Sequence, residues 1–297
     1  MGQWIKQAFI ASDGKLRPIW RAAIYYSAGT WLVFPLLDRC FALVAQSLHL
    51  TPGLTPASIG LGEFETFVVA LICTGAFAIY EHRRVDSYGL PVRRAFSWQT
   101  FEGAFAGIAM AGGVAIGMIV LGGMQIKGLA GSGRALVFSA LAWLAANICI
   151  GIAEEFWFRS YFQVTLWKSI GFWPSASVIA LIFAAEHYFF KQGENVWDVI
   201  TLVSLSLLMS YSLLRTGTLW FAVGFHIAFD YMQLFVIGTP NGAQIPAGRL
   251  LDVAFNGPAW LTGGVLGTEA SFLMYPAIVL LWLYVWWRYR ANPPFRP

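Results

Sequence analysis

Eight stretches of about 18 to 27 mostly apolar residues divide this chain, and they constrain its fold more than any other feature. A helix needs about 20 apolar residues to cross the hydrocarbon core of a bilayer. Only 11% of the 297 residues are charged, against about 25% in an average soluble domain. We therefore predict an all-α, polytopic integral membrane bundle of about eight transmembrane helices. The predicted spans are 22–48, 64–81, 100–124, 136–158, 172–190, 198–215, 217–237 and 270–288.

The distribution of Lys and Arg predicts the orientation of this bundle. With the N-terminus inside, 14 basic residues fall on the inner side and four on the outer side, so the positive-inside rule predicts cytoplasmic termini. We expect the plasma membrane if the organism is a prokaryote, or the endoplasmic reticulum if it is a eukaryote. The inner set is Lys6, Lys15, Arg17, Arg21, Arg83, Arg84, Arg93, Arg94, Arg159, Lys168, Arg215, Arg288, Arg290 and Arg296; the outer set is Lys127, Arg134, Lys191 and Arg249.

The chain shows no internal repeat and no low-complexity linker, so residues 1–297 are predicted to form a single integral membrane domain. We do not expect nucleic acid as a partner. We expect the lipid bilayer to surround the bundle.

The first group of charges inside a predicted span is EEFWFR, at residues 154–159. On a helix Glu155 and Arg159 are four residues apart and share a face, so we expect them to form an ion pair. Glu154 points about 100° away and is free for another task. The structural alternative is an ion pair at the helix end with no chemical role.

The second group is FAAEHYF, residues 183–189. Phe183 lies one turn before His187 and is expected to pack on its imidazole. A histidine that simply packs in the bundle is the structural alternative. Glu186 turns to another face, where we expect it to pair with Lys191.

The third group is HIAFD, in which His226 and Asp230 lie one helical turn apart in the middle of a span. A carboxylate in this position can hold the tautomer of the histidine, and both side chains can face one metal ion. A His–Asp hydrogen bond without a chemical role is the alternative. Because lipid does not accommodate such groups, all three sets are expected to converge inside the bundle. That convergence suits general-base hydrolysis, metal ligation or a proton relay.

These ordered motifs resemble the CAAX-protease and bacteriocin-processing (CPBP) family of intramembrane peptidases. The family is related to the type II CAAX prenyl endopeptidases and includes proteins like lysostaphin resistance protein A. The resemblance covers about a quarter of the chain and implies an all-helical bundle with a peptidase core at residues 136–237. The motifs that carry it are EExxxR (Glu154, Glu155, Arg159), FxxxH (Phe183, His187) and HxxxD (His226, Asp230).

The resemblance implies an endopeptidase that hydrolyses a peptide bond of a membrane-associated peptide or protein, prenylated or not. Glu154 would be the general base that activates water, assisted by His187. Glu155 and Arg159 would orient it. We also expect Glu154 near the cytoplasmic end of its span, close to a membrane-anchored tail.

The family leaves two roles open for His226 and the residue at position 230. They would stabilise an oxyanion, or they would join Glu154 and His187 in binding one divalent metal ion such as zinc. Position 230 is Asp here, where Asn is the other common residue of the family. An ionised Asp cannot donate a hydrogen bond, so it fits an orienting or ligating role better. The sequence contains no HExxH zinc-peptidase motif, so the cofactor is either absent or a single metal ion.

Two other functions remain open from the sequence. A catalytically inactive membrane immunity or partner protein would use the same fold to bind another membrane protein. A proton-coupled transporter would use the acids and histidines as a relay, but paired inverted repeats are expected for it and none is found.

Overall fold

A computed structural model describes residues 7–297, and the predicted inner residue Lys6 lies outside this range. Helices form nearly all of the regular structure, so the chain is a polytopic helical bundle, as predicted. Within the described residues, seven helices are long and apolar enough to cross a membrane. They are Pro18–Ser47, Pro56–Glu81, Trp98–Val120, Gly133–Ile170, Val196–Thr216, Trp220–Ile237 and Gly264–Tyr289.

The predicted span 172–190 is present as the helix α8 (Phe172–Phe190), but it is not among these seven. Its 19 residues include Glu186 and His187 near the C-terminal end, and these lower its apolar character. The first and fourth spans combine several elements. The first consists of α2 (Pro18–Ala28), η1 (Gly29–Val33) and α3 (Phe34–Ser47), and the fourth of α6 (Gly133–Glu154), η4 (Glu155–Arg159) and α7 (Tyr161–Ile170).

Local sequence signals fix several helix ends. Pro56 occupies the first turn of α4 (Pro56–Glu81), and the Thr55 hydroxyl accepts a hydrogen bond of 3.2 Å from the Ser58 amide. Gly217, with φ of 71°, ends α9 (Val196–Thr216) and lets α10 (Trp220–Asp230) return beside it. The remaining helical elements are η2 (Val85–Ser87), η3 (Val92–Arg94), α5 (Trp98–Val120), η5 (Tyr231–Ile237), α11 (Ala259–Thr262), η6 (Gly264–Ala270) and α12 (Met274–Tyr289).

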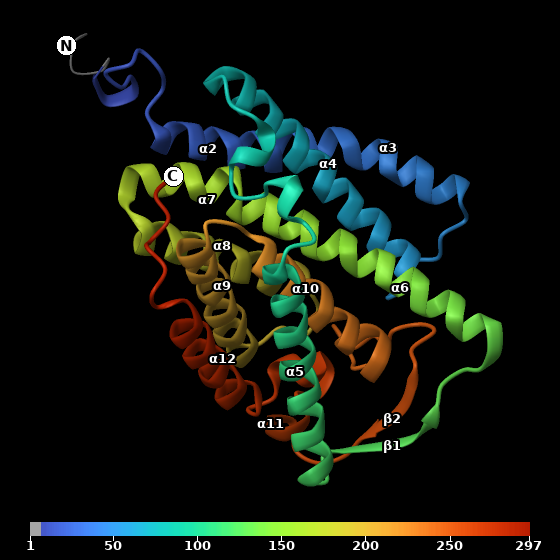
Figure 1. The fold of residues 1–297 in the computed structure, drawn as a ribbon. Coiled ribbons are helices and arrows are strands. Elements are labelled where there is room, and N and C mark those ends of the chain that lie inside the picture. Colours follow the sequence, from blue (N-terminus) through green and yellow to red (C-terminus); the bar gives the residue numbers. More distant parts are fainter. Residues whose placement is uncertain (1–6) are drawn as a thin grey trace.

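A small antiparallel sheet pairs β1 (Met124–Leu129) with β2 (Leu251–Phe255), with Met124 opposite Phe255. In Figure 1 this sheet and α11 lie at one end of the molecule, and the C-terminus lies beside α7 at the other. The sheet therefore belongs to the loops that close one end of the bundle.

Small residues set the closest helix contact, between α5 and α10. A Cβ atom at Gly103 or Gly107 would clash with the carbonyl oxygen of Phe221 or Phe225, respectively. In a membrane such close approach replaces the hydrophobic effect as the source of helix association. The glycines thus hold α10, which carries His226, at a fixed distance from α5.

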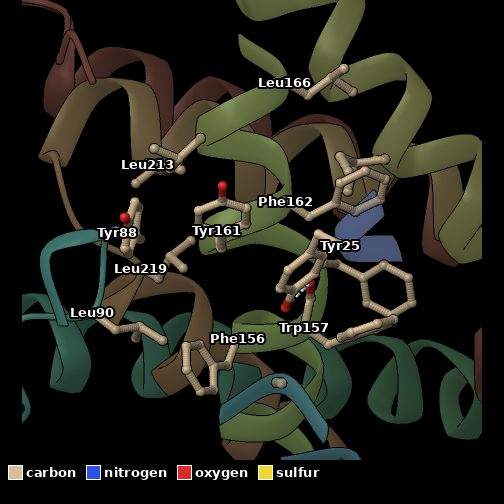
Figure 2. Close-up of a cluster of buried hydrophobic side chains, with 14 of the residues drawn as sticks. Tyr25, Tyr88, Leu90, Phe156, Trp157, Tyr161, Phe162, Leu166, Leu213 and Leu219 are labelled. Atoms are coloured by element: carbon tan, nitrogen blue, oxygen red, sulfur yellow. Dashed lines mark hydrogen bonds between the residues drawn. The ribbon is translucent and has the colours of Figure 1, made fainter. Parts of the chain in front are cut away.

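An aromatic cluster forms the core beside the fourth span. Figure 2 shows Tyr25 from α2 packed among Trp157, Tyr161 and Phe162, with ring centroids 5.0, 5.1 and 6.0 Å from its own. Tyr25, Trp157 and Tyr161 are almost fully buried. This cluster anchors the segment that supplies the EExxxR residues.

Candidate functional site

The seven predicted site residues line one cavity of about 210 Å³ inside the bundle. The cavity is bounded by α4, α6, α8, α9 and α10, so the site exists only when the bundle is assembled. A water molecule occupies about 30 Å³ in the liquid, so the cavity has room for several waters or a short peptide segment. The residues are Glu154, Glu155, Arg159, Phe183, His187, His226 and Asp230.

Glu155 is the centre of a buried hydrogen-bond network. Its Oε1 accepts a hydrogen bond of 2.6 Å from Arg159 Nη1, and both side chains are 2% exposed or less. Arg159 also donates from Nη2 to Ser206 Oγ at 2.7 Å. The same Glu155 oxygen lies 3.2 Å from His226 Nδ1. The predicted ion pair is therefore confirmed, and it extends to α9 and α10. Arg159 is buried in this ion pair, so its predicted place among the basic residues of the inner loops is wrong.

Glu154 is the last residue of α6 and turns toward the cavity. Its Oε2 is buried and makes no hydrogen bond within residues 7–297. That oxygen lies 3.5 Å from His226 Nε2, whereas no hydrogen bond joins Glu154 to His187 in the described chain. A carboxylate that is buried without a hydrogen-bond donor is costly, and water in the cavity would supply the missing donor.

His187 faces the cavity from α8, near its C-terminal end. Its ring packs on Phe183 as predicted, with centroids 4.4 Å apart. Nδ1 lies 2.9 Å from the carbonyl oxygen of Phe183. Because a carbonyl only accepts, this contact assigns the proton to Nδ1 and leaves Nε2 of the neutral ring as an acceptor.

Asp230 lies one turn after His226, with Oδ2 at 3.6 Å from Nε2. His226 Nε2 is therefore flanked by two carboxylates, those of Glu154 and Asp230. The contact of Nδ1 with the Phe183 carbonyl leaves His187 Nε2 free, as in many histidines that bind a metal ion. No group of three or more His, Cys, Asp or Glu side chains in the described range is arranged to hold a metal ion.

Two of the three helices that carry motifs, α6 and α10, change from α to π geometry directly at the site. Glu154 ends α6 and Glu155 begins η4, while Asp230 ends α10 and Tyr231 begins η5. Single π turns inside α-helices are frequent at functional sites, because the wider turn redirects side chains. The sequence spacing alone predicted regular α-helix at both places.

Sequence reasoning missed several polar residues of the cavity, above all Glu63. It lines the cavity from α4, 91 positions before Glu154, and its Oε2 is buried without a hydrogen bond within the described chain. The predicted span begins at 64, one residue after Glu63. The helix in the structure begins at Pro56 and so includes this acid, and an acid inside an apolar span points to function by default. Glu269 and Lys191 also line the cavity.

The predicted pair of Glu186 with Lys191 is wrong. Glu186 accepts a hydrogen bond of 2.6 Å from the Tyr26 hydroxyl, so a helix from the start of the chain satisfies it. Lys191 Nζ lies 3.1 Å from Glu194 Oε1 and 3.1 Å from Glu269 Oε2. Burial alone lowers the pKa of Lys191, but the carboxylates of Glu269, Asp198 and Glu194 outweigh it and hold that pKa above its ordinary value.

Comparison with known proteins identifies the region that carries these residues. The family model described as Type II CAAX prenyl endopeptidase Rce1-like matches residues 136–232, which include all seven predicted site residues. Neither the curated proteins nor the solved structures gave a match. The resemblance to a CAAX-type peptidase is confirmed for this region. At the family level it supports an intramembrane peptidase that acts on a membrane-associated protein.

Proposed function

Since residues 136–232 carry a Type II CAAX prenyl endopeptidase Rce1-like domain, we propose that the chain is an endopeptidase in which Glu154 activates water. The observation that carries the proposal is the convergence of Glu154, His187, His226 and Asp230 on one enclosed cavity. If these side chains faced lipid, they would lie in hydrocarbon and away from the water that the reaction needs. Residues 136–237 would form the peptidase core of a single membrane domain.

Glu154 is proposed as the general base. Its buried Oε2 makes no hydrogen bond to the described chain, so it can accept one from a water molecule. Glu154 would take a proton from this water while the oxygen attacks the carbonyl carbon of the scissile peptide. The same proton would then pass to the departing amine, leaving a carboxylic acid and an amine as products. The Nε2 acceptor of His187 would orient the water from the other wall.

His226 is proposed to stabilise the tetrahedral intermediate. Glu155 Oε1 accepts a hydrogen bond from His226 Nδ1, and a second proton on Nε2 would point toward the carbonyl oxygen of the substrate. Arg159 and Ser206 hold Glu155 in place through the hydrogen bonds of 2.6 and 2.7 Å. Asp230, with Oδ2 3.6 Å from Nε2, would orient this ring.

A Glu154→Gln variant tests the proposal. The amide has the size of the carboxylate but cannot take a proton, so cleavage should fall by about 10²- to 10⁴-fold with little change in stability. The measurement uses purified protein in vesicles and a panel of fluorogenic membrane-anchored peptides, prenylated and unprenylated. Glu65→Gln is the matched control, because Glu65 is a buried acid of α4 that does not line the cavity.

Undiminished cleavage by Glu154→Gln would refute the general-base role. If the wild-type protein cleaves no peptide of the panel but binds another membrane protein, the inactive partner protein becomes the better explanation. Activity before and after dialysis against a chelator, together with metal analysis, separates Glu154-activated water from a metal-dependent reaction.

A further inference from the structure

The bundle has two ends of different composition, which are defined by the loops that meet there. We call the first the basic face, formed by residues 10–17, 82–97, 171, 217–219 and 290–297. The Leu219 amide donates to the Gly89 carbonyl at 2.7 Å, and the Phe295 amide donates to the Leu214 carbonyl at 2.7 Å. These loops therefore lie together at one end of the molecule.

The opposite end, which we call the loop face, is formed by residues 48–55, 121–132, 191–195 and 238–270. The Ala247 amide donates to the Leu54 carbonyl at 2.9 Å, and the Ala130 amide donates to the Leu250 carbonyl at 2.9 Å. The sheet of β1 and β2 belongs to this face, at the end of the molecule away from the C-terminus (Figure 1). With α8 included, successive long helices run alternately between the two faces.

Basic residues are strongly concentrated on the basic face. Twelve of those in the described range lie in or next to its loops, whereas four lie on the loop face. Arg83, Arg84, Arg93 and Arg94 are all exposed there. Such a bias places the basic face on the cytoplasmic side of the membrane. The twelve are Lys15, Arg17, Arg21, Arg83, Arg84, Arg93, Arg94, Lys168, Arg215, Arg288, Arg290 and Arg296; the four are Lys127, Arg134, Lys191 and Arg249.

The site cavity adjoins a second cavity of about 610 Å³ and shares six wall residues with it. The outer part of this second cavity is lined by Gly53, Gln192, Gly242 and Gln244, all from the loop face. We call it the mouth. The walls shared by both cavities are Leu54, Ile59, Glu63, His187, Lys191 and Asn241.

Glu63 and His187 lie near the loop-face ends of their helices, whereas Glu154 lies nearer the basic face, six residues before Ser160, whose hydroxyl donates to the Tyr88 carbonyl at 2.8 Å. Glu63 is seven residues after Pro56, where α4 starts at this face, or about 10 Å at 1.5 Å per residue. His187 lies three residues before the loop-face end of α8. On both helices the site is therefore far from the arginines of the basic face.

From the mouth and the charge bias together, we infer that the site opens on the non-cytoplasmic side of the membrane. The substrate is then an exported or membrane-anchored polypeptide that presents its scissile bond on that side. This inference rests on the proposed peptidase function for its substrate, and it differs from the cytoplasmic presentation of the scissile bond that the sequence suggested. The position of the mouth in the bundle is independent of whether the protein cleaves peptides.

Thiol labelling of intact cells tests the inference directly. In a background where Cys40, Cys73 and Cys149 are replaced by Ser, single cysteines are placed at exposed positions by Gln192→Cys, Gln244→Cys and Phe96→Cys. The first two lie at the mouth. Phe96 lies on the basic face, two residues after the exposed Arg94, and its replacement leaves the charge bias unchanged. The probe is a membrane-impermeant maleimide applied to bacteria with a permeable outer layer, before and after lysis.

Both mouth cysteines should react in intact cells, and Phe96→Cys should react severalfold more after lysis than before. The reverse pattern overturns the inference. A green fluorescent protein fused after Pro297 provides a second readout that needs no cysteine variant, and it should be fluorescent because the C-terminus lies on the cytoplasmic side. A dark fusion at normal protein level counts against the inference.

The outcomes also separate this inference from the proposed function. If the labelling holds but Glu154→Gln cleaves normally, the sidedness stands and the general-base role fails. If cleavage depends on Glu154 but labelling is reversed, the peptidase stands and its substrate approaches from the cytoplasm.

Discussion

The segment from Glu154 to Phe162 separates two interiors of opposite character. On one side Trp157, Tyr161 and Phe162 pack with Tyr25 in the aromatic cluster of Figure 2. On the other side Glu154 and its neighbours line a polar cavity. The aromatic side satisfies its few polar groups, as the Tyr25 hydroxyl donates to the Trp157 carbonyl at 3.3 Å. The cavity side leaves carboxylate oxygens unpaired within the described chain.

This difference shows how one helix can be both a scaffold and a reactive surface. A packed aromatic wall holds the backbone in one arrangement, because protein interiors are packed as densely as organic crystals. A change in volume of even one methylene group disturbs such packing. The carboxylates on the other wall can then remain under-satisfied and available to water or substrate.

The largest effect is expected from Arg159→Ala, on the cavity side. It leaves Glu155 as a buried, uncompensated charge, which costs about 3–5 kcal/mol, and it also releases the carboxylate that holds His226. Apparent unfolding free energy in mild detergent and cleavage activity should both fall. Arg84→Ala is the control, since the Arg84 side chain is 80% exposed and solvent screens its pair with Asp86. Equal losses in the two variants would contradict the role of burial.

Trp157→Ala probes the aromatic side. Removing this 2% exposed ring leaves a cavity against Tyr25 and is expected to cost about 3–5 kcal/mol. Activity of the protein that remains folded should fall less than in Arg159→Ala. Trp31→Ala, at a site that is 79% exposed to the surroundings, should change the unfolding midpoint little. If Trp157→Ala abolishes activity in fully folded protein, the two interiors are not separable as described.

Lys191→Met tests the charge balance where the cavity meets the mouth. Loss of its contacts with Glu194 and Glu269 should cost about 1.5–3 kcal/mol. Because the folded-state pKa of Lys191 is raised, its contribution is fully present below the ordinary lysine pKa of about 10.4 and is lost only as pH rises through the higher folded value. The stability difference from wild type should therefore be constant from neutral pH to about pH 10. Lys127→Met, at an exposed position, is the control, and a difference that already vanishes near pH 8 would contradict the assignment.

Tyr25→Phe is expected to have the smallest effect. It keeps the ring in the aromatic cluster and removes a hydroxyl that donates to the Trp157 carbonyl at 3.3 Å and accepts from the Thr74 hydroxyl at 3.5 Å. Hydrogen bonds of this kind are worth about 0.5–1.5 kcal/mol each. Thermal unfolding of the two proteins in the same detergent measures this difference. Tyr188→Phe changes a half-exposed ring that makes no side-chain hydrogen bond in the described chain, and it should be neutral. A loss above about 3 kcal/mol in Tyr25→Phe would mean that the hydroxyl does more than make these two hydrogen bonds.

Within single helices the sequence predicted contacts well. The four-residue spacing of Glu155 and Arg159, and that of Phe183 and His187, gave pairs that the structure contains. Contacts between helices were predicted poorly. The partner of Glu186 is Tyr26, 160 positions away, and not the nearby Lys191.

The amino-acid sequence by itself determined the membrane class, the approximate spans and the ordered motifs, because apolar length and helical periodicity are local properties of the chain. Only the tertiary structure decided that His226 lies between Glu154 and Glu155, that Glu63 joins the cavity, and that the cavity opens at the loop face. These features depend on the rotation and depth of each helix in the bundle. Close packing such as that at Gly103 and Gly107 fixes both, and no single helix contains that information.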